Sequence, residues 1–148
     1  MTKDFIHKVK IYYEDTDSGG VVYYANYLKF LERARTEAIF SLGLSNTNLL
    51  KEHGTLIIVK SCNINYIKPA KFEDNLKIVS KLKSMTRTSF LMQQVFERDN
   101  RIISEAEVRL VTINKQGKPI QIPKVLDVKF KENTIPILYD ICFTFLSN

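Results

Sequence analysis

The sequence has few of the residues that stabilise secreted, disordered or metal-dependent proteins. It contains two cysteines, Cys62 and Cys142, and two histidines, His7 and His53, each far from the other in the chain. Four prolines and five glycines in 148 residues exclude a linker-rich chain. We expect the cysteines to be small buried hydrophobic residues rather than a disulfide. The isolated histidines predict no metal site.

Targeting segments and familiar catalytic loops are also missing. The first residues lack the apolar run of a signal peptide, and no segment reaches the roughly 18 to 20 apolar residues needed to cross a bilayer. We therefore expect a cytoplasmic protein with no transmembrane segment. Phosphate-binding and dinucleotide-binding loops are absent, as is the G-x-S-x-G turn. An enzyme with so few histidines would work with carboxylates and backbone dipoles, and no cofactor is expected.

The composition is that of an ordinary globular protein of one domain. Hydrophobic residues make up 45% of the chain and charged residues 26%, with a net charge of +6. This charge favours anionic partners but does not select among nucleic acid, a membrane surface and the phosphates of CoA. The basic residues are dispersed and do not interleave with aromatic residues in a recognition motif, so nucleic-acid binding is not expected.

The hydrophobic pattern predicts five strands and three helices. Strands are expected over residues 5–13, 56–67, 75–84, 88–98 and 101–113, where apolar side chains alternate. The first strand places Tyr13 on the apolar face with Phe5, and the last places Ile102 with Leu110. A long helix is expected over residues 24–42, with short helices over 46–53 and 124–131.

This order of elements predicts an α+β domain, with one antiparallel sheet wrapped around one mostly apolar helix. The domain covers residues 1–132. Residues 133–148 form a strongly apolar extension that is too short to span a membrane. We expect the extension either to pack on the domain or another subunit, or to lie on a membrane surface.

Carboxylates and glycines gather directly before the long helix. Residues 13–27 include Glu14, Asp15 and Asp17, followed by Gly19 and Gly20. A helix N-terminus offers free N–H donors and a partial positive charge, which can hold the oxyanion of a carbonyl under attack. A nearby carboxylate can attack that carbonyl or activate water. The same residues also suit an ordinary Asx-type turn, and their chemistry alone leaves both interpretations open.

This segment closely resembles the YbgC-type and 4-hydroxybenzoyl-CoA-type thioesterases of the hotdog superfamily. The match is nearly residue for residue over 12–37, especially at 14–23 (EDTDSGGVVY) and 31–37 (LERARTE). Weaker similarity continues at 87–89, 105–107 and 122–124, so that residues 5–131 are covered. The resemblance implies a hotdog fold of about five strands around a central helix, and hydrolysis of a fatty or aromatic acyl thioester of CoA or of acyl carrier protein.

The resemblance also implies roles for individual residues. Asp17 is the expected catalytic carboxylate, acting either as nucleophile or as general base. The backbone N–H of Tyr24, at the expected helix start, would polarise the carbonyl. YbgC-type proteins usually carry histidine at this position, so a histidine side chain cannot act here, but the backbone donor remains. The implied substrate-binding residues are Gly20, Val22, Lys60, Ser61, Arg87, Thr88 and Ser89.

The segment 87–89 would contact CoA or, alternatively, form an exposed strand start. Glu14 and Asp15 are expected to shape the loop. By resemblance the protein is a homo-oligomer, a dimer or tetramer, with active sites between subunits. The alternative is a non-catalytic protein of the same fold that binds acyl carrier protein or a Tol-Pal envelope complex. Because the pocket is built across subunits, one chain does not reveal the acyl preference.

Overall fold

The computed structural model describes residues 4–132, so Cys142 and the extension 133–148 lie outside the described residues. The elements are β1 (Phe5–Lys10), a 3-10 helix (Tyr13–Asp15), α1 (Asn26–Ser41), α2 (Asn46–His53), β2 (Leu56–Tyr66), β3 (Asn75–Met85), β4 (Ser89–Arg98), β5 (Arg101–Ile113) and α3 (Lys124–Glu132). This is the predicted order. Within residues 4–132, no helix is long and apolar enough to cross a membrane.

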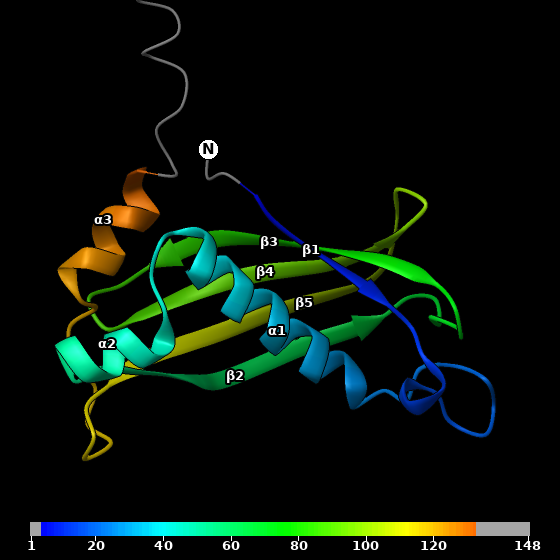
Figure 1. The fold of residues 1–148 in the computed structure, drawn as a ribbon, viewed down its shortest axis with the longest axis horizontal. Helices are drawn as coiled ribbons and strands as arrows, with labels where there is room; N and C mark the ends of the chain where they lie inside the picture. Colours follow the sequence, from blue (N-terminus) through cyan, green and yellow to red (C-terminus); the bar gives the residue numbers. More distant parts are fainter. Residues whose placement is uncertain (1–3, 133–148) are drawn as a thin grey trace, which may run out of the picture.

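The five strands form one antiparallel sheet in the order β1-β3-β4-β5-β2. Figure 1 shows α1 lying across one face of this sheet. The loop between β1 and α1 lies at one end of the sheet, and α2 and α3 lie at the opposite end. The arrangement of one sheet around one long helix is therefore as predicted, and it fixes which residues share an end of the molecule.

Apolar burial and one polar network hold α1 against the sheet. The buried face of the helix consists of Tyr27, Phe30, Leu31, Ala34, Ala38 and Ile39. Beneath it, the fully buried Gln94 of β4 donates to the carbonyl of Leu31 and to the hydroxyl of Ser80, at 3.2 and 2.9 Å. Its Oε1 accepts from Arg35 Nη1 at 3.0 Å. Every polar atom of the Gln94 amide is thus satisfied, as burial requires.

Two of the predicted strand positions are wrong, and each has a local cause. Ile102 is 42% exposed, whereas Ile103 is buried. A bulge between Phe96 and Glu97 shifts the pairing, because Phe96 pairs with Ser104 while Glu97 pairs with Ile102. Tyr13 leaves the first strand, which ends at Lys10, and begins the 3-10 helix, where its exposed ring stacks on Phe72.

The edge strand β2 exposes several apolar side chains to solvent. On its outer side it pairs with no strand of residues 4–132. It is 11 residues long and carries exposed apolar or aromatic side chains at Leu56, Ile58, Val59 and Tyr66. Cys62 on the same strand is also exposed, so the prediction that it is buried is wrong. Natural proteins usually protect long edges of this kind with charges, proline or a covering element. The β2 edge is therefore a candidate for pairing with another chain.

Candidate active site

The loop between β1 and α1 folds into a narrow hairpin around its two glycines. Thr16 and Val22 form an antiparallel bridge, and Asp17 N–H donates to the carbonyl of Val21 at 2.9 Å. Gly20 N–H donates back to the carbonyl of Asp17 at 3.0 Å, with a φ of 77° that favours glycine. Val22 is buried and donates to the carbonyl of Ala70, which anchors the hairpin to the domain.

The carboxylate of Asp17 is exposed and held at the tip of this hairpin. Its Oδ1 accepts a hydrogen bond of 2.8 Å from Gly19 N–H. A Cβ atom placed on Gly19 would lie 3.1 Å from the same oxygen, so only glycine leaves the carboxylate undisturbed. The turn chemistry expected of these residues and a positioned carboxylate are therefore both present, and they involve the same atoms.

Tyr24 lies two residues before the observed start of α1 at Asn26, rather than at the helix start itself. Asn26 holds the segment that leads into α1, since its side chain donates to the carbonyl of Asp15 at 2.9 Å. Tyr66, the last residue of β2, donates its hydroxyl to the carbonyl of Tyr24 at 3.0 Å. The Tyr24 N–H donates a hydrogen bond to no acceptor among the described residues. This donor is therefore available at the positive end of α1.

Asp15 shapes the loop. Its Oδ2 accepts from Tyr12 N–H at 2.9 Å, and its carbonyl also accepts from Tyr23 N–H at 3.0 Å. The neighbouring hydroxyl of Tyr24 raises the pKa of Tyr23 above 10.0, so this phenol stays neutral at physiological pH. Of the three loop carboxylates, Asp17 is the one that accepts a hydrogen bond at the glycine turn.

The remaining predicted residues do not lie near Asp17 within one chain. The hairpin of Asp17 contacts Lys71, just before β3, whereas Arg87 follows the end of β3. An 11-residue strand at about 3.3 Å per residue separates these positions by roughly 35 Å. Thr88 and Ser89 share the far end with Arg87. Lys60 and Ser61 lie between, in the middle of the β2 edge, where the pairing with β5 shifts by one residue.

The segment 87–89 is partly built into the fold. Ser89 is buried, and its N–H donates to the hydroxyl of Thr86 at 3.0 Å. Thr88 is half-buried, and its carbonyl accepts from the backbone N–H of Thr112. Arg87 is exposed and lines a surface hollow together with Gln121 and Lys131. Of the three, Arg87 is the residue whose side chain is free to meet a ligand from solvent.

Two residues that orient the site were not found from the sequence. Asn26 and Tyr66 reach the loop from α1 and from the far end of β2. Tyr66 is 42 residues from Tyr24, and no local pattern links such positions. An asparagine at a helix start is a common capping residue, which is the one signal that could have pointed to Asn26.

Comparison with known proteins places this hairpin in a family. The family model of the thioesterase-like superfamily matches residues 12–130. The chain belongs to this superfamily. It is 38% identical to the acyl-CoA thioester hydrolase YbgC of Escherichia coli O6:H1, over 84% of this chain and 93% of that protein. It is 36% identical to the acyl-CoA thioesterase YbgC of Haemophilus influenzae, over 88% and 96%.

A solved structure agrees with this assignment. A probable thioesterase from Bartonella henselae superimposes with a TM-score of 0.78 and 31% identity, over 82% of this chain and all of that one. The predicted hotdog fold and the predicted class of thioester hydrolase are therefore confirmed. The match ends at Phe130, so the apolar extension of this thioesterase lies beyond the family's common part.

Proposed function

We propose that this thioesterase hydrolyses acyl-CoA thioesters, with Asp17 as the catalytic carboxylate and the Tyr24 N–H as the donor to the carbonyl oxygen. The observation that carries the proposal is the loop itself. It presents an exposed carboxylate, fixed by Gly19, seven residues before a backbone N–H that donates to no described residue. Both groups belong to the stretch that matches the thioesterase-like family model.

The chemistry follows from these two groups. The Tyr24 N–H stabilises the negative charge that develops on the carbonyl oxygen, because a preorganised dipole needs no reorganisation when the charge appears. Asp17 then acts by one of two routes. It attacks the carbonyl carbon, expels the CoA thiolate and leaves a mixed anhydride that water hydrolyses, or it takes a proton from the water that attacks directly. Both routes yield a carboxylic acid and free CoA.

The active unit in this proposal is a homodimer formed through β2. Two copies of this long, apolar edge would pair antiparallel about a two-fold axis near Ser61, extending the sheet across the interface. Such pairing satisfies the free backbone groups of the edge and buries Ile58, Val59 and their neighbours. It also explains why half-exposed aliphatic side chains line a strand whose outer edge pairs with no described strand.

Antiparallel pairing would complete the substrate site. In one chain, the Asp17 hairpin and Tyr66 mark the C-terminal end of β2. Ser89 marks the N-terminal end, because it pairs with Val111 and Val111 pairs with Ile58. When two β2 strands pair antiparallel, the C-terminal end of one lies beside the N-terminal end of the other. The partner's hairpin would then face this chain's Arg87, whose charge suits a CoA phosphate.

Replacing Asp17 tests the catalytic assignment. In Asp17→Asn, acyl-CoA hydrolysis should fall by roughly two to four orders of magnitude, with an unchanged circular dichroism spectrum and melting temperature. Asp99→Asn is the matched control, since it makes the same chemical change at the exposed turn between β4 and β5. Near-normal turnover in Asp17→Asn would refute the role. Binding of acyl-CoA or acyl carrier protein without turnover by the wild type would favour the non-catalytic alternative.

Mixing two inactive variants tests the shared site. Asp17→Asn and Arg87→Ala each damage both sites of their own dimer, but a mixed dimer contains one site with both native residues. Random reassociation at equal amounts should restore about one quarter of the wild-type activity at low substrate concentration. Mixed dimers, detected by mass spectrometry, that show no recovery would rule out a site shared in this way without affecting the role of Asp17.

A further inference from the structure

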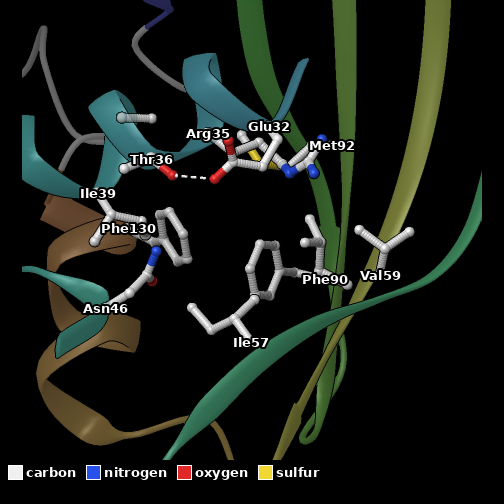
Figure 2. Close-up of a pocket in the computed structure, with 12 residues that line it drawn as sticks. Glu32, Arg35, Thr36, Ile39, Asn46, Ile57, Val59, Phe90, Met92 and Phe130 are labelled. Carbon is white, nitrogen blue, oxygen red and sulfur yellow. Dashed lines mark hydrogen bonds between the residues drawn. The ribbon is translucent and has the colours of Figure 1, made fainter. Parts of the chain in front are cut away.

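A second pocket lies at the end of the molecule opposite the Asp17 hairpin. It has a volume of about 150 Å³ and lies between α1, α2, α3 and the sheet. Figure 2 shows Ile39, Ile57, Phe90 and Phe130 around the empty space. The rings of Phe90 and Phe130 lie 5.3 Å apart, and both side chains are 2% exposed, so together they close the pocket's inner end.

The mouth of the pocket is polar and faces the β2 edge. Glu32 and Thr36 of α1 lie along the rim and are joined by a hydrogen bond of 2.8 Å. Asn46, the first residue of α2, completes the polar part, and the half-exposed Val59 of β2 lies at the opening. A polar rim with an apolar interior suits a ligand whose apolar group enters first and whose polar part stays outside.

The pocket cannot serve the Asp17 of its own chain. Thr36 lies 10 residues along α1 from Asn26, which is about 15 Å at 1.5 Å per residue. Tyr27, Phe30 and Leu31 fill the space beneath the intervening turns of α1. The antiparallel pairing of β2 removes this separation. Ile57 and Val59 lie at the start of β2. In the paired dimer, the partner's Tyr66 would lie beside this part of the strand, and the partner's hairpin with Tyr24 and Asp17 would lie next to Tyr66.

We propose that this pocket of one subunit receives the acyl group of the thioester held by the hairpin of the other, with Phe130 setting the limit on acyl size. The inference rests on the proposed function. An apolar cavity of about 150 Å³ holds a molecule the size of benzene. The substrate class is therefore an acyl group of one aromatic ring or about six carbons, and long fatty chains are excluded by the closed inner end.

The test is a panel of acetyl-, hexanoyl-, benzoyl- and dodecanoyl-CoA. The wild type should prefer hexanoyl and benzoyl groups. Phe130→Ala opens the inner end and should raise kcat/KM for dodecanoyl relative to hexanoyl by roughly tenfold or more, since each methylene that enters is worth about fourfold. Ile57→Phe narrows the pocket and should lower the hexanoyl to acetyl ratio by roughly tenfold on the same scale. If Phe130→Ala fails to fold, Ile57→Phe still tests the proposal, because Ile57 is only half-buried.

Phe40→Ala is the control, because Phe40 is exposed on α1 and does not line the pocket. It should leave every ratio unchanged. Unchanged ratios in both pocket variants would overturn the inference while leaving Asp17 catalysis intact. An equal change in KM for all four substrates would also overturn it, because the pocket would then hold the CoA arm. A wild type that hydrolyses none of the four would instead refute the proposed function, and the pocket's role with it.

Discussion

Gly19→Ala is the sharpest test of whether the position of the Asp17 carboxylate matters. The new Cβ would lie 3.1 Å from Asp17 Oδ1, closer than ordinary van der Waals contact, so the carboxylate must shift by a few tenths of an ångström. Misplacing a reacting group by 1 Å can cost about 100-fold in rate. A smaller shift of this kind should therefore lower kcat by about tenfold.

The assay is steady-state hydrolysis of hexanoyl-CoA, combined with thermal unfolding of the same samples. We expect kcat to fall while KM and the melting temperature change little, because Gly19 does not have a positive φ and its substitution strains no backbone. Gly117→Ala should behave in the opposite way. Gly117 has a φ of 81° with nothing near its added Cβ, so the variant loses stability but keeps its turnover. A Gly19→Ala enzyme with wild-type kcat would refute the reasoning.

Two further predictions concern stability. Gln94→Leu should lower the free energy of unfolding by about 2 kcal/mol, because the half-buried guanidinium of Arg35 loses its acceptor; denaturant titration against Gln93→Leu, on the other face of β4, checks this. Burial raises the pKa of Tyr27 above 10.0, so its contribution to stability is complete below pH 10 and is lost as the pH rises through the folded pKa. The free energy of unfolding, measured from pH 8 to 11, should therefore fall above pH 10, and it should fall less in Tyr27→Phe than in the wild type. Equal slopes against pH in the two proteins would contradict this prediction.

Local periodicity was sufficient to predict the elements of this fold. The alternation through β3, β4 and β5 placed Phe90, Met92 and Phe96 correctly, because side chains in a strand point to opposite faces in turn. It failed at Ile102, where an unpaired residue in β5 reverses the alternation. Nothing in the sequence of either strand marks this bulge, since the bulge depends on how two strands pair.

The site was predictable only in its local part. The turn around Asp17 forms from neighbouring residues, and the stretch 12–37 carries the family resemblance. The acyl pocket that we propose takes its walls from six elements, so no short window of sequence contains it. The predicted residues also fall at two ends of the sheet. In the dimer that we propose, they come together only across two chains, and a pattern within one chain does not encode that.

Tyr66 couples the loop between β1 and α1 to the structure of the β2 edge. Its ring packs edge-on against Tyr27 at 5.0 Å, while its hydroxyl holds the peptide plane that follows Tyr24. Fraying at the last residue of β2 would release that plane and the orientation of the N–H groups around it. If β2 pairs in the proposed dimer, subunit separation on dilution and the decline in specific activity should share one midpoint, so that the protein concentration would control the activity.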